Sequence, residues 1–405
     1  MSTLWRNREF TLLWTSQCLS DLGGAIATLA IPLLVLELTG SPVKAGTVGT
    51  AAQVARLLCR LPSGVLADRF NRRLALLTCD VIRLLAFVVL AAAVATRHAG
   101  LTTIVVVGLI DAVCGSLFNT TEHAALRSIV PATQLPDAVA RNEARSYGTS
   151  LAGPPLGGLL FGITHTLPFI GNALSYLASL IGIAMIRKPL QSERPDQHPG
   201  HTAALLEGLR FVFGNPFLRS VLIIAAPLNF ALHGSIFTII ITLQTHDVPP
   251  GVIGLTETIV GAGGLIGALA APTVQRWFSF ATLIRCLCWA ATLFLALSAL
   301  LTASVAAAAP IALAIFVGPA CNAALFGYQA AITPDRLQGR VLSVIFLVAM
   351  SAAAAAPLLA GLLVTAWSPP TSILFFAAAV SVAALTATFA PAIRHLRAGK
   401  ELTPA

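Results

Sequence analysis

Residues 64–73 read Gly64-Val-Leu-Ala-Asp-Arg-Phe-Asn-Arg-Arg73 and connect two long apolar runs of the chain. The runs, near 45–67 and 74–95, each hold the roughly 20 mostly apolar residues that an α-helix needs to cross a lipid bilayer. The connection itself carries one acid and three arginines, groups that stay in water or among lipid headgroups. We therefore predict that the chain crosses the membrane, turns at its surface and crosses back.

The composition of the whole chain also indicates a membrane protein. Of its 405 residues, 57% are hydrophobic and only 10% are charged, and the mean hydropathy is +0.85. Soluble domains carry about a quarter charged residues, so this chain has too few polar side chains to form a surface in water. The first apolar run, from Phe10 to Leu38, is longer than the ~7–15 residues of a cleavable signal core and is expected to be the first span.

Apolar runs of this length recur along the sequence and predict an all-α polytopic membrane protein with 12 transmembrane helices. The expected spans lie near 10–38, 45–67, 74–95, 101–123, 142–164, 168–186, 217–243, 251–273, 281–303, 308–332, 341–366 and 371–391. An alternative is 10 or 11 spans with a buried soluble helix. The charge pattern described next favours an even count.

Lysine and arginine are distributed unequally between alternate connections of the predicted spans. One set of connections, together with both termini, holds 19 of them, whereas the other set holds only Lys44 and Arg97. Because cytoplasmic loops are enriched in lysine and arginine, both termini are expected in the cytoplasm of a chain in the inner or plasma membrane. The formal net charge of +9 is thus a topology signal, and we expect no nucleic-acid partner.

The longest polar stretch divides the chain into two parts. We expect an N-terminal six-helix bundle at 1–186, a cytoplasmic linker at 187–216 and a C-terminal six-helix bundle at 217–405. A weak internal repeat supports two pseudo-symmetric halves, because Gly64-Val-Leu-Ala-Asp68 recurs as Gly267-Ala-Leu-Ala-Ala271. Repeated six-helix halves are an architecture of membrane transporters.

The linker contains a short amphipathic segment. Leu205, Leu209 and Val212 lie on one face of the predicted helix, with Leu206 and Phe213 beside them. A helix with an apolar face and basic neighbours commonly lies in the plane of the membrane surface. We therefore expect this segment to lie flat on the cytoplasmic surface.

Residues 64–73 resemble the signature loop of the major facilitator superfamily, Gly-x-Leu-(Ala/Gly)-Asp-Arg-x-Gly-Arg-(Arg/Lys). Only the second glycine differs, because Asn71 stands there, and asparagine also tolerates a positive φ. The resemblance implies the major facilitator fold of two six-helix bundles with a substrate site between them near the middle of the bilayer. It also implies that the chain is a transporter and not an enzyme.

The resemblance further implies a gating role for this loop. Its charged members are Asp68, Arg69, Arg72 and Arg73. Gly64 is expected to allow close approach of a helix, and Asp68 to contact the positive end of a helix in the other half. Arg72 is expected to pair with an acid on the fourth span, Glu122, in a latch that breaks on opening. The simpler alternative is a charged cluster that only anchors the loop in the cytoplasm.

The fifth predicted span contains Gly153-Pro-Pro-Leu-Gly-Gly158, which resembles the Gly-Pro-x-x-Gly-Gly motif of proton-driven exporters in the same superfamily. Glycine allows tight contact between helices, and proline bends a helix. The exporter-motif residues are Gly153, Pro154, Gly157 and Gly158. The alternative is generic packing by small residues. This motif is the reason that we expect export.

Further stretches resemble a branch of the superfamily that contains macrolide-efflux-like and enterobactin-exporter-like proteins. They are Leu38-Thr-Gly-Ser-Pro42, Asp80-x-x-Arg83, Glu207-Gly-Leu-Arg-Phe211 and Pro334-Asp-Arg-Leu-Gln-Gly-Arg340, so the resemblance covers nearly the whole chain. The fourth span departs from the pattern. Many exporters have Arg-x-x-x-Gly there, whereas this chain has Asp111-Ala-Val-Cys-Gly115. A coupling scheme built on that arginine therefore cannot be assumed.

Charges inside the predicted spans need a specific reason, because a charge at the bilayer centre costs about 2.5–3.5 kcal/mol on insertion scales. We single out Asp21, Arg56, Arg60, Asp80, Arg83, Asp111 and Glu257. Asp80 and Arg83 are three residues apart on one helical face, and we expect them to pair with each other. Arg56 and Arg60 also share a face, so they need an acid or an aqueous cavity, and Asp21 and Asp111 are the candidate acids.

Three carboxylates are candidates for proton coupling. A carboxylate buried between helices has its neutral form favoured, so Asp21, Asp111 or Glu257 is expected to take a proton on one side of the membrane and release it on the other. The alternative for each is a structural partner of an arginine. Asn229 and His233, four residues apart in the seventh span, are expected to line the same cavity, although packing is the more common role of such a histidine.

We therefore expect a secondary active transporter that exports a small amphipathic molecule by alternating access, driven by proton entry. Drugs, antibiotics, secondary metabolites and siderophores all fit mostly apolar walls with two arginines. The expected partners are this substrate, protons and the lipid bilayer, and the chain is expected to be a monomer. The alternatives are an uncoupled facilitator or importer and a lipid flippase of the same fold.

An enzyme is not expected, because the sequence has no His-Glu-x-x-His and no Gly-x-Ser-x-Gly motif. Seven cysteines all lie in apolar runs, and an odd number in such places does not form a disulfide framework. Cys286 and Cys288 are two residues apart on a predicted helix and point to different faces. We therefore expect no metal and no cofactor.

Overall fold

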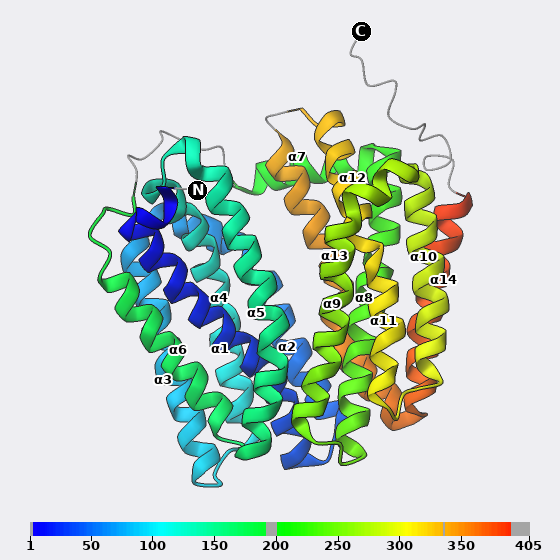
Figure 1. Cartoon of the computed structure of the whole chain (residues 1–405), viewed down its shortest axis with the longest axis horizontal. Helices are drawn as coiled ribbons and strands as arrows, with labels where there is room; N and C mark the ends of the chain where they lie inside the picture. The colour runs from blue at the N-terminus through cyan, green and yellow to red at the C-terminus, as the bar shows by residue number, and fades with distance from the viewer. Residues whose placement is uncertain (1–2, 192–200, 335–336, 390–405) are drawn as a thin grey trace. The chain divides into compact units, whose positions relative to one another are not determined.

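A computed structural model describes residues 3–191, 201–334 and 337–389, and every regular element in these ranges is a helix (Figure 1). The α-helices are α1 (Arg8–Thr39), α2 (Pro42–Arg69), α3 (Arg72–Ala95), α4 (Leu101–Ile129), α5 (Leu135–Ile163), α6 (Leu167–Ala184), α7 (His201–Gly214), α8 (Pro216–Thr245), α9 (Pro250–Trp277), α10 (Phe280–Ala299), α11 (Ala308–Phe316), α12 (Gly318–Ile332), α13 (Gln338–Ala366) and α14 (Pro369–Phe389). Three short 3₁₀ helices are η1 (Thr3–Arg6), η2 (Ala132–Gln134) and η3 (Val305–Ala307).

The predicted spans coincide with these helices to within several residues, so the all-α membrane fold is confirmed. Within the described ranges, 10 helical segments are long and apolar enough to cross a membrane. Helices α2 and α5, of 28 and 29 residues, are equally long but are not among these 10. The count of 12 spans stays a prediction.

Short stretches of glycine, serine and proline determine where one helix ends and the next begins. Gly40 ends α1 with φ +60°, a left-handed conformation that glycine adopts without a steric penalty. The next residue, Ser41, caps α2 by accepting a hydrogen bond from the backbone N–H of Lys44. Pro42 follows in the first turn, where a missing N–H costs nothing. The Leu38–Pro42 motif is thus a stop for one helix and a start for the next.

The tenth predicted span, 308–332, is interrupted. Helix α11 ends at Phe316, and α12 begins at Gly318 with Pro319 in its first turn. Proline has no N–H to donate, and its ring clashes with the preceding turn, so it interrupts a helix at this point. The segment Val305–Ile332 is still long and apolar enough to count as one candidate span.

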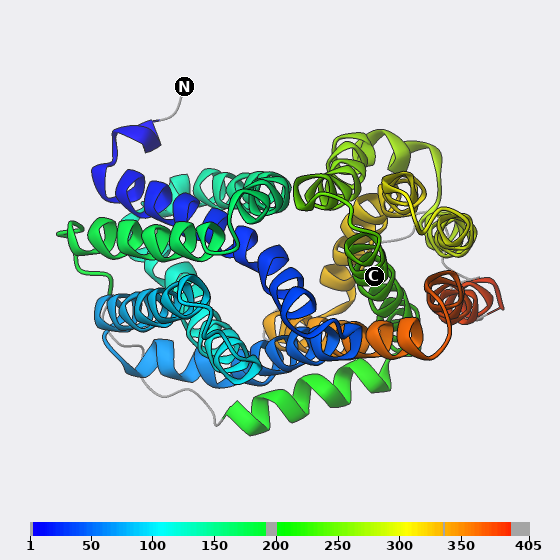
Figure 2. The same cartoon turned by 90° about the horizontal axis from the view of Figure 1, so that it is seen from below.

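Contacts divide the chain into two compact units, Met1–Asp196 with Val248–Thr258, and Gln197–Asp247 with Ile259–Ala405, here called unit 1 and unit 2. In unit 1, α1 packs along α5 and α6, α3 along α4 and α6, and α2 along α4. Figure 2 shows α1, in dark blue, lying beside α6, in green. The first turns of α9 also belong to unit 1. The bundle boundaries predicted above stay a prediction.

In unit 2, α8 packs along α13 and α14, and α10 packs along α11 and α14. Two buried apolar clusters hold these helices together, one around Ile284, Leu287 and Ala384 and one around Leu218 and Val344. Helices in a bilayer associate by close van der Waals packing, because lipid tails are as apolar as the side chains. The alanine-rich sequences of α13 and α14 suit such packing.

Protein covers part of the apolar face of the amphipathic helix α7. Val212 is fully buried and belongs to the same cluster as Leu218 and Val341, and α7 packs on α13. A Cβ added at Gly208 would lie 3.1 Å from the backbone oxygen of Arg340, so the two helices approach closely. Leu206 and Phe213 beside this face are exposed, so the predicted position of α7 on the membrane surface stays a prediction. The side chain of Leu205 and residues 192–200 of the linker lie outside the described part.

Candidate functional site

Helix α5 carries a row of buried polar and small residues toward the interior of unit 1. Asn142, Arg145, Thr149 and Gly153 follow each other at intervals of three or four, so they share one helical face. All four are buried, whereas the intervening Glu143 and Ser146 are exposed. Because α5 packs on α1, this face points toward the centre of the unit.

Arg145 is the centre of a three-helix ion cluster, here called the Arg145 cluster. Its Nη1 donates a hydrogen bond of 2.9 Å to Oε1 of Glu122 on α4, and its Nη2 one of 3.3 Å to Oε2. Its Nε lies 2.9 Å from Oδ2 of Asp21 on α1. Asn142 adds a 3.5 Å contact to Oε1 of Glu122. The planar guanidinium of arginine suits this two-pronged arrangement.

The two acids of the Arg145 cluster differ in access to solvent. The Asp21 side chain is 37% exposed and the Glu122 side chain only 4%. One arginine facing two carboxylates leaves one formal negative charge, which is costly in a low-dielectric interior. A single proton on the accessible acid makes the cluster neutral, so the arrangement suits reversible protonation at Asp21.

The expected pair of Arg72 with Glu122 is not present. Arg72 Nη1 instead donates to the backbone oxygens of Ala124 and Leu190, each at 3.2 Å, and to Oγ of Ser128 at 3.3 Å. The expectation is wrong in this structure because Arg145 already satisfies Glu122 from the α5 side. Arg72 therefore ties α3 to the end of α4.

The other members of the predicted gating motif are dispersed. Arg69 is exposed at the end of α2, and the side chain of Asp68 lies outside the described part. A Cβ added at Gly64 would meet no described atom within 4 Å, so the predicted close helix approach is absent there. Asn71 has φ −63° and caps α3 by accepting from the N–H of Leu74, so a positive φ is not needed.

A second ion cluster links α3 to α6, and it confirms the expected pair. Arg83 Nη2 donates to Oδ1 of Asp80 at 2.9 Å, and both side chains are almost completely buried. Oδ2 of Asp80 accepts a hydrogen bond of 2.6 Å from Ser179 on α6. Gln17 on α1 in turn donates to Ser179 at 3.2 Å. Each oxygen of this buried carboxylate thus has a partner, as buried charge requires.

Asp111 joins the second cluster through a tyrosine. The hydroxyl of Tyr176 donates to Oδ1 of Asp111 at 2.6 Å. The guanidinium of Arg83 lies over the ring of Tyr176 at 4.2 Å and over that of Phe118 at 4.7 Å, within the range of cation–π attraction. Nη1 of Arg83 also comes within 3.8 Å of a Cβ placed at Gly115. Arg83 of α3 thus lies beside Asp111–Gly115 of α4, the stretch where many exporters have an arginine and this chain has none.

Asp21 and Asp111, the candidate acids for the α2 arginines, both have other partners. Asp21 contacts Arg145 and Asp111 contacts Tyr176. Arg56 and Arg60 are exposed on α2, and Arg56 has no ion pair or hydrogen bond with a described residue. An exposed guanidinium such as that of Arg56 stays hydrated or faces headgroups.

Glu257 is the most isolated of the intramembrane acids. It lies on the first part of α9, which belongs to unit 1, and its side chain is partly buried. Among the described residues it has neither an ion pair nor a hydrogen bond. The neighbouring Thr258 donates to the backbone oxygen of Leu151 on α5 at 3.2 Å. Helix α9 is therefore held in place beside Glu257, whose carboxyl group has no described partner.

The glycines of the exporter motif form close helix contacts in unit 1. A Cβ added at Gly153 would lie 2.2 Å from Cβ of Ala25 on α1, and one at Gly157 would lie 2.7 Å from the oxygen of Ile26. A Cβ at Gly158 would lie 2.0 Å from the oxygen of Pro250 on α9. Pro154 lies buried in the same row. The expected tight packing is therefore present, whereas the role of the motif in export stays a prediction.

In unit 2, Asn229 and His233 bond mainly to their own helix. Nδ2 of Asn229 donates to the oxygen of Ala225 at 2.9 Å. Nδ1 of His233 lies 2.9 Å from the oxygen of Asn229, and the side chain is exposed. These contacts bring the two residues together on one face of α8. Their place in a substrate cavity stays a prediction.

The charge pattern counted Arg145 among the 19 basic residues of the cytoplasmic connections and termini, and the sequence did not single out Tyr176. The four-residue periodicity that leads from Asn142 and Arg145 to Gly153 was the available signal, since it puts the arginine on the interior face of α5. No comparable signal exists for Tyr176, because its pairing with Asp111 depends on how α4 and α6 are rotated.

The described residues contain no group of three or more histidine, cysteine, aspartate or glutamate side chains placed to hold a metal ion. All seven cysteines are free thiols. The chemistry of unit 1 is therefore that of carboxylates, guanidiniums and hydroxyls. Such groups exchange protons and bind charged or polar ligands.

Comparison with known families gives a match over nearly the entire chain. The model of a family described as transmembrane secretion effector, within the major facilitator superfamily, matches residues 2–402. The match includes both ion clusters and the exporter motif.

Several curated relatives are efflux proteins. Multidrug efflux pump Tap of Mycolicibacterium fortuitum is 26% identical over 405 residues, covering 92% of this chain and 93% of that protein. Enterobactin exporter EntS of Citrobacter koseri is 25% identical, covering 66% of this chain. Macrolide efflux protein A of Streptococcus pyogenes is 24% identical, covering 65% of this chain. The chain spans only 64% and 66% of the length of the latter two proteins.

A solved structure supports the fold. A bacterial homologue of the human lysosomal transporter Spinster, in an inward-facing and unoccupied conformation, matches with a TM-score of 0.76. The match covers 98% of both chains at 16% identity, which relates the folds only.

Proposed function

Since this chain belongs to the transmembrane secretion effector family of the major facilitator superfamily, we propose that it exports a small amphipathic molecule in exchange for protons. It is a multi-pass membrane transporter homologous to multidrug and siderophore efflux pumps, and not an enzyme. The resemblance to the major facilitator superfamily, which rested on the sequence motifs, is thereby confirmed. The direction of transport, the coupling ion and the substrate class are the parts that the proposal adds.

The observation that carries proton coupling is the set of unbalanced acids in unit 1. Glu257 has no described partner, and the Arg145 cluster has one more carboxylate than arginine. An intramembrane charge without a counter-ion is costly, so a membrane protein retains it for a function. A protonated carboxyl group is neutral and does not carry this cost. When the group loses the proton, the cost returns. Asp21 and Glu257 are therefore the proposed proton carriers.

Export is supported by the packing of the exporter motif and by the relatives. Gly153, Gly157 and Gly158 allow α5 to lie against α1 and the first turns of α9. The named relatives with long alignments are efflux pumps, and an efflux function transfers to this chain as part of the proposal. The positive-inside pattern places both termini in the cytoplasm, which also belongs to the proposal.

Proton flux in everted membrane vesicles tests the proposal. A pH gradient is imposed, and antibiotics, dyes and siderophores are added one at a time while a pH-sensitive dye reports the gradient. We expect one class of compound to collapse the gradient in vesicles with the wild-type protein. E257Q and D21N should reduce the collapse to the level of empty vesicles.

The exposed acid Glu143 on α5 provides the matched control, and E143Q should keep the wild-type response. If labelled substrate equilibrates across the membrane while no compound collapses the gradient, the protein is an uncoupled facilitator and the proton part of the proposal is wrong.

A further inference from the structure

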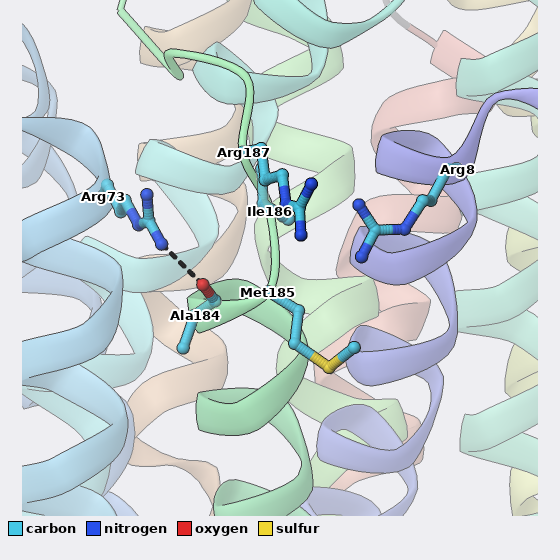
Figure 3. Close-up of a pocket in the computed structure, with 6 residues that line it drawn as sticks. All are labelled: Arg8, Arg73, Ala184, Met185, Ile186 and Arg187. Atoms are coloured by element: carbon cyan, nitrogen blue, oxygen red, sulfur yellow. Dashed lines mark hydrogen bonds between the residues drawn. The ribbon is translucent and has the colours of Figure 1, made fainter.

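Three arginines converge on a pocket of about 460 Å³ at the end of unit 1 where α1 begins (Figure 3). Arg8 comes from the first turn of α1, Arg73 from the first turn of α3, and Arg187 from the segment after α6. In Figure 3 the side chains of Arg8 and Arg187 point toward one another across the pocket, and Met185 lies below them. Neither the latch predicted for Arg72 and Glu122 nor the proposed proton coupling uses this pocket.

Most N–H donors of the three guanidiniums have no hydrogen-bond partner among the described residues. Arg73 Nη2 donates to the backbone oxygen of Ala184 at 2.5 Å, which is its single bond to a described residue. Among the described residues, Glu9 is the acid beside these arginines, with Oε1 3.8 Å from Nη1 of Arg8 and Oε2 accepting the backbone N–H of Arg187 at 2.9 Å. Three guanidiniums against one carboxylate leave two formal positive charges, and each guanidinium has five N–H donors. In the described part of the chain, no further anion balances these like charges.

Apolar rows on two helices lead to the pocket. On α6, Leu174, Leu177, Ile181 and Met185 are exposed at intervals of three or four, so they form one continuous face. On α3, the exposed residues Leu74, Val81, Leu85 and Val88 form a similar face that begins next to Arg73. Helices α3 and α6 pack side by side. In a chain that spans a bilayer, exposed apolar faces of this kind contact acyl chains.

We propose that Arg8, Arg73 and Arg187 bind the phosphate of an anionic phospholipid, with its acyl chains along α3 and α6. A phosphate group offers several acceptor oxygens, which arginine binds in a two-pronged geometry. A basic pocket between the ends of membrane helices is a suitable place for a lipid headgroup. A free phosphate would satisfy the arginines but would make no use of the apolar rows, so a lipid is the better fit.

Native mass spectrometry of the purified full-length protein, titrated with phosphatidylglycerol or phosphatidylethanolamine, tests the proposal. We expect phosphatidylglycerol to bind more tightly than the zwitterionic lipid. A basic residue near an anionic surface contributes enough for R187A to weaken binding about fivefold. On the same basis, the R8A/R73A/R187A triple variant should weaken it about a hundredfold. R73K should weaken binding less than R187A does, because it keeps the charge and loses only the two-pronged geometry.

Arg127, exposed at the end of α4 and outside the pocket, is the matched control. R127A should leave phosphatidylglycerol binding unchanged, and an equal loss in R127A and R187A would mean that only net charge matters and would overturn the site. Inorganic phosphate at the same concentration should not displace the lipid. Full displacement would show that the pocket takes free phosphate and would overturn the assignment to a lipid. Size-exclusion profiles of the variants should match the wild type, which separates lost binding from lost folding.

Discussion

The interiors of the two units differ in their polar content. Unit 1 buries four charged side chains, Asp80, Arg83, Glu122 and Arg145, besides several amides and hydroxyls. The buried polar side chains described in unit 2 are hydroxyls and one glutamine, such as Ser235, Thr238, Ser372 and Gln329. The ion pair described in unit 2, between Arg340 and Glu207, is partly exposed.

This difference indicates that the two units have different tasks. Buried hydroxyls in unit 2 bond to backbone or to each other, as Thr238 does with Gly234 and Ser372, and such bonds only fix helix packing. Buried ions in unit 1 are costly and form networks across α1, α3, α4, α5 and α6. We therefore assign the proposed proton coupling to unit 1 and expect unit 2 to tolerate polar changes better.

The largest expected effect is the loss of Arg145. R145A leaves Glu122 and Asp21 facing each other without a counter-ion, which should lower the free energy of unfolding by about 3–5 kcal/mol. Titration with sodium dodecyl sulfate in mixed micelles measures it. R127A, at an exposed position, is the control and should leave the unfolding curve in place. Equal curves for R145A and the wild type would show that the cluster does not stabilise unit 1.

The second-largest expected loss of stability is at Gly158, where α5 lies against α9. G158A places a methyl group 2.0 Å from the backbone oxygen of Pro250, so α5 and α9 must separate, at a cost of about 1–3 kcal/mol. The same unfolding measurement applies. G148A on the same helix meets no atom within 4 Å and should be more stable than the wild type by about 1 kcal/mol, because alanine favours a helix. A stable G158A would mean that the contact is looser than described.

A smaller effect is expected inside unit 2. S372A removes the hydroxyl that lies 2.9 Å from Thr238 and should cost about 0.6 kcal/mol, the average for a hydrogen bond between membrane helices. A double-mutant cycle of S372A with T238V isolates the pair. A coupling energy as large as that between Arg145 and Glu122 would remove the contrast between the two units.

The smallest effect is expected at Gly64. A Cβ there meets no described atom within 4 Å, so G64A should leave the protein as stable as the wild type or slightly more stable. Its counterpart in the weak repeat, Gly267, would place a Cβ 2.1 Å from the oxygen of Phe316, and G267A should be destabilising. Equal effects at the two positions would show that the halves are more alike than their packing suggests.

The sequence predicted the helices well and their contacts less well. Spans such as 74–95 and 217–243 follow from length and hydropathy, which depend on the segment alone. The pair Asp80–Arg83 was predictable because both residues lie on one helix. The partner of Glu122 was not, because it depends on which face of α5 meets α4. The packing of Val212 of α7 was not predicted, because a membrane surface and the apolar side of α13 look the same from a hydropathy pattern.

Gradient-driven export by reconstituted protein tests the central claim most directly, namely that the proton carriers lie in unit 1. Substrate accumulation against its gradient would be measured for D21N and E257Q, with D247N, a change of an exposed acid in unit 2, as the control. We predict that D21N and E257Q lose accumulation but still equilibrate substrate, whereas D247N accumulates it like the wild type. Full accumulation by both D21N and E257Q would contradict the account.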